Sequence, residues 1–364
     1  MSDSLAGPVA QAIARATAFL LAEAAHEFPG LRHEMIFPRA AGFTPVDERQ
    51  IADVFGRATM ANLLLDMADL SQDEVMIAAL RSIARREADY VARAKIGGRA
   101  GGWSYFPGLP ELPPDLDSLA AALSLFARIA PEHLSLCAEP VALALAGAGA
   151  GGEMETWIVA PGDPPDDRQR MEWAIDNCWG RGTDVDVLAN FHHALFVAAP
   201  GRHAETIRRG AAKVIAMQRG DGAWAASWYS GFTYAGALCL RLLRETGVGR
   251  TAIASGTDYL RQAQAEDGSW GAKQPQALDT ACGVWGLAEA DPVGAAAEIR
   301  RGVRALLRLQ TEDGGWPASP WIQMQIGRAT GYVVRVATHE NATITTALCL
   351  KALLLGETTR LAAP

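Results

Sequence analysis

The chain has 364 residues, 49% of them hydrophobic, which is enough for one large domain or two ordinary ones with a sizeable core. A net charge of −8 without any basic run argues against a nucleic-acid surface, and no apolar run reaches the roughly 18 residues that suggest a membrane span. The five scattered cysteines form no Cys-x-x-Cys pair, so a zinc or disulfide framework is not expected. The N-terminus lacks a signal-peptide charge pattern, and we expect a cytoplasmic protein.

In chain order, helical patterns come in pairs. An amphipathic helix near 8–26 precedes a second one, and an outer helix at roughly 73–95 precedes the helix opened by Asp115. A degenerate third unit holds a long loop at 151–167, and three clearer pairs follow it. The second members of the six pairs are predicted near 46–69, 115–130, 184–199, 230–245, 278–290 and 340–356.

A short motif repeats between the helices of the later pairs. The segments "QRGDGAW", "QAEDGSW" and "QTEDGGW" end at Trp224, Trp270 and Trp316, so successive tryptophans are 46 residues apart. Asp-Gly predicts a tight turn after the outer helix. The indole offers a large flat surface with one N–H donor, and the Gln can bond to the neighbouring turn. We interpret these motifs as structural ties between adjacent helix pairs.

The second helix of each pair is apolar nearly all round, which indicates burial inside a ring rather than the polar outer face of a solenoid. We therefore predict an all-α fold, an (α/α)6 barrel, or toroid, of six helix pairs that occupies residues 1–364 as a single domain. An open solenoid is the alternative.

Closure of the ring would bring the N-termini of all inner helices to one mouth. Two of these helices begin with an Asp-X-Asp pair, namely Asp115 with Asp117 and Asp184 with Asp186. Asp186, Asn190 and His193 follow at i, i+4 and i+7 on one helix face. A polar stripe on an apolar helix needs buried partners, so we expect Asp117 to face the Asp186–Asn190 turn across the lumen. Each of these residues also has a purely structural interpretation, as a helix cap or a satisfied core group.

With these residues in place, the segment from about Gly101 to Leu353 resembles the catalytic barrel of class II terpene cyclases of the squalene–hopene type. The repeated Q-x-x-D-G-x-W block is the hallmark of that family. Protein prenyltransferase β subunits share the toroid, but their Asp, Cys and His zinc ligands are not in place in this chain.

The resemblance assigns roles to individual residues. "GGWSYFPGLPELPPDLDSLAAAL" is similar to the family segment that ends in Asp-X-Asp-Asp-Thr-Ala, so Asp117 takes the position of the catalytic acid and Asp115 that of the first Asp. Ser118 stands where the family has a further Asp. "DVDVLAN" resembles the family's Asp-Val-Thr-Ala-His segment, which implies that Asp186 and Asn190 lie beside the acid, with Asn190 in place of the His.

Class II cyclisation begins with protonation of an alkene or epoxide, which demands a neutral acid in a water-free pocket. Burial and neighbouring carboxylates both keep an Asp protonated at neutral pH. The resemblance implies that Asp117 is this acid, supported by Asp115, Asp184, Asp186 and Asn190. No cofactor is required, and a divalent cation held by the Asp cluster is the alternative. Aromatic faces would stabilise the cation, and the candidate substrate-binding residues are His193, Trp103, Tyr105, Trp228, Tyr229, Tyr234, Asp279, Trp285 and Trp321.

We thus expect a terpene cyclase or isomerase that acts on a small prenyl or olefinic substrate. Two other classes stay open: a non-catalytic toroid that binds a lipid or a partner, and an (α/α)6 carbohydrate-active enzyme with paired carboxylates. Full-length members of the family add a second barrel, so the resemblance implies a smaller or open cavity, or one completed by a partner subunit. No nucleic-acid partner is expected, and peripheral membrane contact and a homodimer are both compatible with the sequence.

Overall fold

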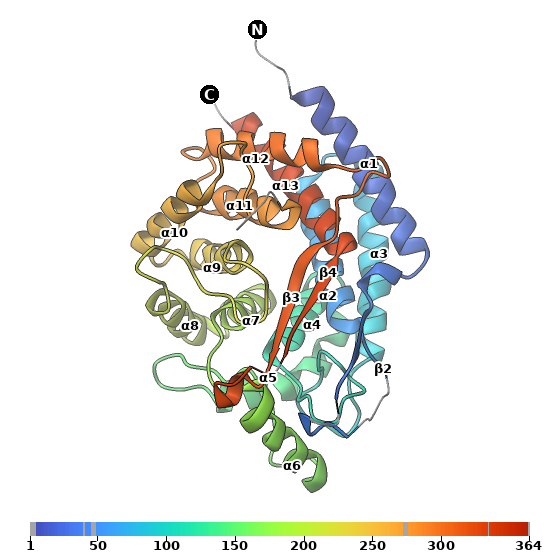
Figure 1. Cartoon of the computed structure of the whole chain (residues 1–364), viewed down its shortest axis with the longest axis vertical. Helices are drawn as coiled ribbons and strands as arrows, with labels where there is room; N and C mark the ends of the chain where they lie inside the picture. The colour runs from blue at the N-terminus through green and yellow to red at the C-terminus, as the bar shows by residue number, and fades with distance from the viewer. Residues whose placement is uncertain (1–4, 39–40, 45–48, 272–275, 334, 363–364) are drawn as a thin grey trace.

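Six helices line the inside of a ring in the computed structural model, which describes residues 5–38, 41–44, 49–271, 276–333 and 335–362 (Figure 1). Each inner helix packs against the next along the chain, and the last packs against the first, so the ring is closed. The predicted toroid is therefore confirmed and the open solenoid is wrong. The inner helices are α2 (Val54–Leu70), α4 (Leu116–Ile129), α7 (Val185–Ala198), α9 (Thr233–Thr246), α11 (Ala277–Ala290) and α13 (Ala342–Ala362).

A second layer of helices surrounds this ring. Its members differ from the inner helices in pattern: α12 buries Ile299, Val303 and Leu306 while its arginines point to solvent, whereas α11 is buried almost continuously from Ala277 to Leu287. An amphipathic helix suits the outside of a ring and an apolar one its inside, which is why the sequence pattern separated the two sets. The outer helices are α1 (Ala6–Ala25), α3 (Glu74–Arg93), α5 (Ala138–Ala146), α8 (Ala204–Ala216), α10 (Arg250–Ala263) and α12 (Ala296–Leu309).

The repeated motifs tie neighbouring outer helices together, as the sequence predicted. In the last copy, Trp316 Nε1 donates to the Leu306 carbonyl of α12 at 2.9 Å, while Gln310 Nε2 donates to Gly314 at 2.9 Å and to Ala12 of α1 at 3.0 Å. Gln218 and Gln264 reach the next outer helix in the same way. The turn approaches α1 so closely that a Cβ on Gly314, whose φ is +90°, would lie 2.6 Å from the Arg15 carbonyl oxygen. The third motif thus joins the end of the chain to its beginning.

We expect that replacing Gln310 with Ala lowers the free energy of unfolding by about 2 kcal/mol, because two carbonyl groups lose their donor at the point where the ring closes. Chemical denaturation followed by circular dichroism measures this change. Gln11, exposed on α1, is the matched control, and its replacement with Ala should change stability by less than about 0.5 kcal/mol. Equal effects of the two substitutions would contradict the proposed tie.

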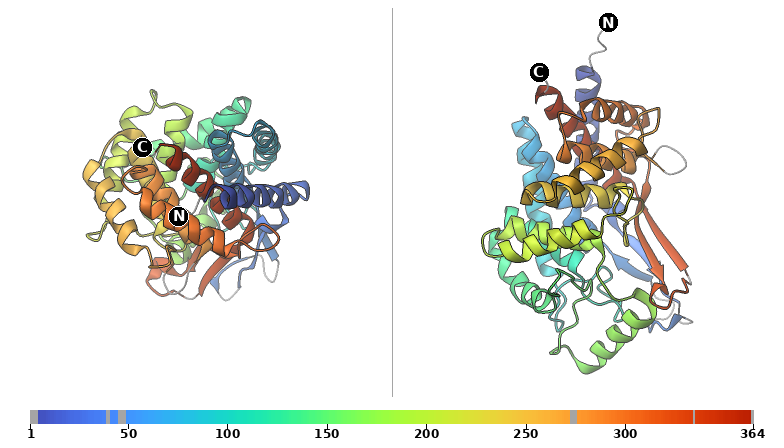
Figure 2. Two further views of the ribbon diagram at one scale, coloured as in Figure 1. Left: turned by 90° about the horizontal axis from the view of Figure 1, so that it is seen from above. Right: turned by 90° about the vertical axis from the view of Figure 1, so that its left-hand side faces the viewer.

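Two β-hairpins lie beside the helices and were not predicted. One pairs β1 (His33–Ile36) with β2 (Arg49–Ala52), and the other pairs β3 (Ser319–Ile326) with β4 (Arg335–Asn341). The helix expected near 46–69 consequently begins only at Val54, after β2. Figure 2 shows both hairpins on the same side of the ring, where the His33 and His339 rings stack with centroids 4.3 Å apart.

Strand β3 crosses the mouth of the barrel. It pairs with the segment that precedes α9, through bonds from Ser230 N to Trp321 O and from Gln323 N to Trp228 O, both 2.9 Å long. The lumen is thereby covered at the end where the inner helices begin. The shorter helices of the described residues are η1 (Pro29–Leu31), η3 (Pro131–Cys137), α6 (Pro165–Ala174), η4 (Ile175–Trp179) and η5 (Arg328–Thr330).

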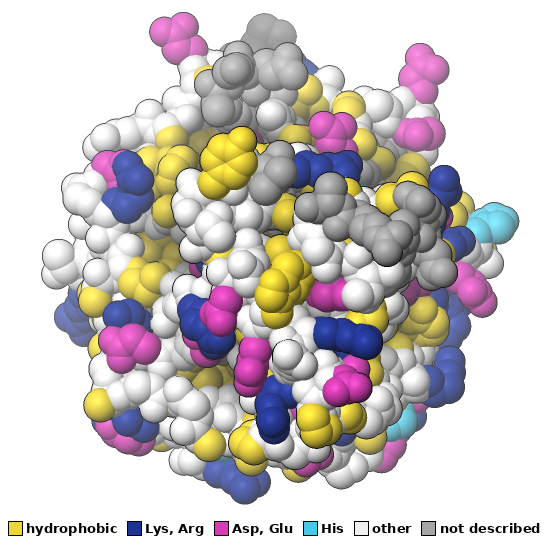
Figure 3. Space-filling view, turned by 60° about the horizontal axis from the view of Figure 1, so that its bottom comes forward, with side chains coloured by type: hydrophobic (Ala, Val, Ile, Leu, Met, Phe, Trp, Pro, Cys, Tyr) yellow, Lys and Arg dark blue, Asp and Glu magenta, His cyan; other side chains and the backbone are white. Residues whose placement is uncertain are grey.

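The charges on the surface are mixed, as expected from a sequence without a basic run. On the face shown in Figure 3, basic and acidic side chains are interspersed, with hydrophobic side chains between them. Within the described ranges, no helix combines the length and the apolar character needed to cross a bilayer.

Candidate active site

Asp115 is the N-cap of α4. Its Oδ1 accepts a hydrogen bond from Ser118 N at 2.7 Å, and its Oδ2 accepts one from Ser118 Oγ at 2.9 Å. Burial raises the pKa of Asp115 to about 6, against the effect of these bonds. The serine that stands in place of the family's further Asp is therefore a partner of Asp115, and Asp115 begins the helix as its residue type predicts.

Asp117 lies in the first turn of α4 and is only 8% exposed. Its Oδ1 accepts a hydrogen bond from Asn190 Nδ2 at 2.7 Å, and its Oδ2 is hydrogen-bonded to the Tyr229 hydroxyl. Burial raises the pKa of Asp117 to about 7, opposed by these two bonds, and the charges of Asp115 and Asp184 add to the rise. The predicted contact between Asp117 and the Asp186–Asn190 turn is confirmed for Asn190.

Asp186 binds backbone N–H groups rather than Asp117. It is fully buried, and its Oδ2 accepts hydrogen bonds from the backbone N–H groups of Ser227 and Trp228 at 2.9 and 3.0 Å. Burial, reinforced by the charge of Asp184, raises the pKa of Asp186 to about 7. The side chain therefore anchors the segment that carries Tyr229, and it reaches Asp117 through charge rather than through a direct bond.

Asp184 is held by three donors. Arg328 Nη2 donates to its Oδ1 at 2.8 Å, while Trp228 Nε1 and Thr156 Oγ1 donate to its Oδ2 at 2.7 and 2.9 Å. Arg328 belongs to η5, at the tip of the β3–β4 hairpin, so Asp184 clamps this hairpin onto α7. Among the described residues, no three of the four carboxylates come close enough to share one cation. The four carboxylates are thus separate hydrogen-bonded groups.

Two cavities adjoin Asp117 and Asn190. The upper pocket lies under β3, and the lumen pocket lies inside the barrel. The upper pocket is lined by Phe55, Tyr105, Leu112, Asp115, Asp117, Thr156, Trp157, Val187, Trp228, Ile322 and Met324. The lumen pocket is lined by Phe55, Thr59, Asn62, Leu63, Asp66, Ala120, Ala121, Ser124, Arg128, Asn190, His193, Tyr234, Leu238, Arg241 and Trp285.

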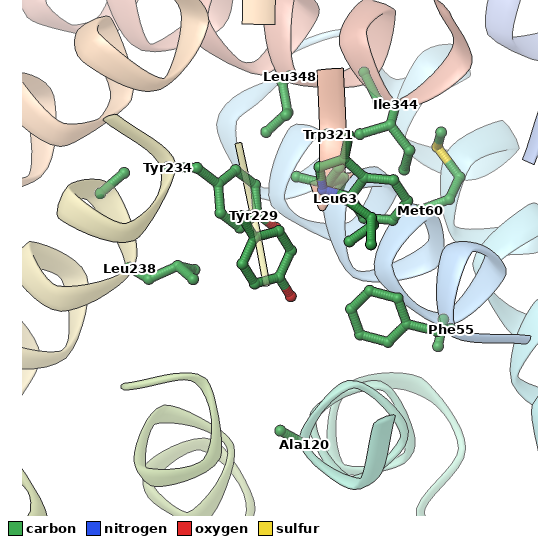
Figure 4. Close-up of a cluster of buried hydrophobic side chains, with 14 of the residues drawn as sticks. Phe55, Met60, Leu63, Ala120, Tyr229, Tyr234, Leu238, Trp321, Ile344 and Leu348 are labelled. Atoms are coloured by element: carbon green, nitrogen blue, oxygen red, sulfur yellow. The ribbon is translucent and has the colours of Figure 1, made fainter. Parts of the chain in front are cut away.

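Phe55, Tyr229, Tyr234 and Trp321 lie in one buried cluster (Figure 4), and the Tyr229 hydroxyl of this cluster is hydrogen-bonded to Asp117. Tyr229 stacks on Tyr234 with ring centroids 4.4 Å apart, and Trp321 stacks on Phe55 at 5.7 Å. Tyr234 also meets the ring of Trp285 edge-on at 6.3 Å. These faces form an apolar, electron-rich wall that suits a positively charged intermediate.

Most of the predicted substrate-binding residues come together here. Tyr105 and Trp228 line the upper pocket, His193, Tyr234 and Trp285 line the lumen pocket, and Tyr229 and Trp321 lie among the same aromatic rings. Burial lowers the pKa of His193, whose Nε2 lies 3.1 Å from Glu245 Oε2.

Two predicted residues lie elsewhere. The indole of Trp103 donates to the Val91 carbonyl of α3 at 2.9 Å, as the motif tryptophans do, so this ring belongs to the wall between helices. Asp279 Oδ1 accepts a hydrogen bond from Thr233 Oγ1 at 2.5 Å, between α9 and α11. Neither side chain lines one of the two pockets.

The sequence interpretation missed Phe55, Arg241 and Arg328. Phe55 stands in an apolar run and carries no distinguishing signal. Arg241 did carry one, because a charged residue in the buried run "GALCLRLL" must have an internal partner, and Lys351 stands at the same place in "TALCLKAL".

The fold is a closed α/α toroid with a buried group of acidic side chains at the mouth of its ring. Residues 182–332 match the family model of the squalene-hopene cyclase C-terminal domain, a range that includes Asp184, Asp186, Asn190 and Arg328. The predicted resemblance to the squalene–hopene type is therefore confirmed.

Two curated proteins match shorter segments. Lanosterol synthase from Homo sapiens is 29% identical over 152 residues, which is 36% of this chain and 21% of that protein. Copalyl diphosphate synthase from Streptomyces cyslabdanicus is 40% identical over 73 residues, which is 20% of this chain and 14% of that protein. The matched segments thus span about a fifth or less of these relatives.

Solved structures match over nearly the whole chain. The type II terpene cyclase MstE from Scytonema superposes with a TM-score of 0.71 at 18% identity, covering 97% of this chain and 99% of MstE. A variant of MstE is known in complex with its substrate, geranylgeranyl dihydroxybenzoate. A possible member of the GH105 family from Klebsiella pneumoniae matches at 14% identity over 100% of this chain and 94% of its own, with a TM-score of 0.57. At these identities the likeness concerns the fold, and the activity has to be argued from the site.

Proposed function

We propose that this chain is a class II-type terpene cyclase or isomerase in which Asp117 protonates a carbon–carbon double bond of a small prenylated or otherwise olefinic substrate. One observation carries the proposal: the buried carboxyl group of Asp117, whose pKa is raised to about 7, lines the largely apolar upper pocket beside an aromatic wall. The match of residues 182–332 and the substrate of MstE support the same class of reaction.

The surroundings of Asp117 meet both demands on such an acid. A pKa of about 7 keeps a large fraction of the carboxyl groups protonated at neutral pH. After proton transfer, the carboxylate would be stabilised by the amide N–H of Asn190, the hydroxyl of Tyr229 and the N-terminal end of α4. Asp117 can therefore be neutral before the reaction, and hydrogen-bond donors are already in place to stabilise its carboxylate afterwards.

The chemistry balances without an added reagent. The proton of Asp117 bonds to one alkene carbon and leaves a carbocation on the other. A second double bond of the substrate attacks this cation and forms the ring bond. A neighbouring carbon then loses a proton, either to the Asp117 carboxylate or to solvent that reprotonates it, which completes an isomer of the substrate and restores the acid. The rings of Tyr229, Tyr234, Trp285, Trp321 and Phe55 would stabilise the cation during these steps.

The two alternative classes fit the site less well. A carbohydrate-active enzyme needs room for a water molecule and polar partners for sugar hydroxyls, whereas Phe55, Leu112, Val187, Ile322 and Met324 surround the upper pocket. A toroid that only binds a lipid has no need of a buried carboxyl with a raised pKa, because burying such a group costs stability.

We expect solvent deuterium to appear in the product. Purified protein is incubated in D2O containing EDTA with geranylgeranyl dihydroxybenzoate and with simpler prenylated aromatics, and the products are analysed by mass spectrometry and NMR. Protonation by Asp117 should give a cyclic isomer that carries one carbon-bound deuterium, while the same reaction in H2O gives an isomer of unchanged mass. Substrate that binds and is recovered unchanged would favour the lipid-binding toroid, and an uncyclised product without deuterium would contradict the proposal.

A further inference from the structure

Asn190 bridges two groups with opposite hydrogen-bonding needs. Its Nδ2 donates to Asp117 Oδ1 at 2.7 Å, and its Oδ1 accepts from Arg241 Nη2 at 3.2 Å. A guanidinium group can only donate, so the amide oxygen has to face Arg241 and the amide nitrogen has to face Asp117. Without Arg241, the amide is free to turn by 180° and to present its oxygen to a protonated Asp117.

The guanidinium of Arg241 makes few other interactions. Its carbon lies 5.2 Å from the ring centroid of Trp285, and its buried Nε has no hydrogen-bond partner. Among the described residues, Arg241 has no carboxylate at ion-pair distance, whereas Arg128 and Lys351 bind the two oxygens of Asp66 at 2.7 and 2.8 Å. Within the described residues, the guanidinium of Arg241 thus donates to Asn190 without forming an ion pair, while its charge also acts on Asp66, His193 and Glu245.

Every inner helix contributes further charged groups to the end of the lumen where Arg241 lies. Their charges also act on any group that titrates there. These groups are Asp66 and Asp69 of α2, Arg128 of α4, His193 of α7, Glu245 of α9, Glu289 of α11 and Lys351 of α13. Asp115, Asp184 and Asp186 face Asp117 at the other end, with Tyr229 and Tyr234. The chain from Arg241 through Asn190 to Asp117 connects these two ends.

We propose that Arg241 is a positioning residue for the acid: it holds the amide of Asn190 so that the N–H group faces Asp117, and its charge strengthens that N–H as a donor. The inference rests on the proposed role of Asp117 as the acid. The side-chain amide of Asn190 is neutral and has no charge of its own to offer to Asp117. Arg241 supplies the charge from one residue further away.

The consequence for the acid follows from its conjugate base. A stronger donor stabilises the carboxylate more than the neutral carboxyl group, so Arg241 makes Asp117 a stronger acid. Removing the guanidinium should leave Asp117 protonated up to a higher pH, but as a weaker acid. A role confined to packing would change neither property in this correlated way.

The titration of Asp117 is the direct test. The infrared band of its protonated carboxyl group, assigned by difference from the Asp117→Asn variant, is followed from pH 4 to pH 10 without any substrate. In Arg241→Met the midpoint should rise by about one pH unit, and Arg241→Lys, which keeps the charge, should recover at least half of the change. Arg128→Met, which removes a cation that does not touch Asn190, is the matched control and should leave the midpoint in place.

A double-mutant cycle tests whether Arg241 acts on Asp117 through Asn190. If Arg241 acts through Asn190, then Arg241→Met should cause no further change in the Asn190→Ala background. An unchanged midpoint in Arg241→Met, or the same rise in both backgrounds, would overturn the inference. Circular dichroism and thermal melting confirm that each variant is folded, and the Arg241→Lys variant carries the test if Arg241→Met does not fold.

Turnover separates this inference from the proposed function. With an accepted substrate, Arg241→Met should lower kcat about tenfold on the acidic plateau and move the falling limb of the pH profile upward, with KM changed less than twofold. If no olefin is ever turned over, the proposed function fails, while the infrared titration still decides whether Arg241 acts on Asp117 through Asn190.

Discussion

Replacing Asp117 with Asn should reduce turnover at least about 10⁴-fold while the ring remains folded, since the proton that starts the reaction is removed and nothing else in the site is rearranged. Asn is close to Asp in shape and can still bond to Asn190 and to the Tyr229 hydroxyl. Product formation by mass spectrometry measures the loss, and circular dichroism with thermal melting checks the fold.

Asp279 provides the matched control for this experiment. It is also an Asp in the first turn of an inner helix, and burial raises its pKa, but it binds Thr233 and lines neither pocket. Asp279→Asn should therefore keep turnover within about twofold of the unsubstituted protein. Full activity in Asp117→Asn, or equal losses in the two variants, would rule out Asp117 as the acid.

The second large effect concerns stability against pH. The pKa of Asp117 is about 7 in the folded chain and 3.8 ordinarily, so between about pH 4 and pH 7 the folded state retains a proton that the unfolded chain has released. Stability contributed by this group is present at low pH and decreases as the pH rises through the folded pKa. A shift of this size corresponds to at most about 4 kcal/mol, and we expect about 2 kcal/mol after relaxation of the site.

The comparison with Asp117→Asn isolates this contribution. Histidines with lowered pKa, such as His33 at about 3 and His339 at about 4, act in the opposite direction over part of the same range, because the unfolded chain binds their protons first. The difference between the two proteins removes the histidine contribution. By urea unfolding, Asp117→Asn should match the unsubstituted protein near pH 4 and be more stable by about 2 kcal/mol at pH 8, and a difference independent of pH would show that Asp117 titrates at its ordinary pKa.

Much of the fold was accessible from the sequence because it rests on local rules repeated along the chain. The Asp-Gly turn, the motif tryptophan and the contrast between amphipathic and apolar helices each act within one helix pair, and their repetition indicates a ring. The N-terminal position of the two Asp-X-Asp pairs on inner helices is part of the same regularity. It was sufficient to single out Asp117 and Asn190 as neighbours, which the hydrogen bond between them confirms.

The roles within the acidic cluster were not accessible in this way. The same Asp-X-Asp pattern yields a helix cap in Asp115, a backbone anchor in Asp186 and a clamp in Asp184, whose partner Arg328 lies 144 residues further along the chain. Strand β3 crosses the mouth because it pairs with residues 228–230, and no local sequence pattern predicts this pairing. Trp103 was assigned to the pocket as an aromatic residue and Asp279 as an acidic residue at the start of an inner helix, and their hydrogen bonds turn them away from it.

The sequence by itself thus determined that the chain forms a ring of paired helices and that acidic residues gather at one end of it, because helix periodicity and turn chemistry are local properties. Which of those carboxyl groups remains protonated beside an apolar pocket was decided only by the tertiary structure. That outcome depends on burial and on donors such as Tyr229, Asn190 and Arg328, which come from distant parts of the chain and meet only when the ring closes.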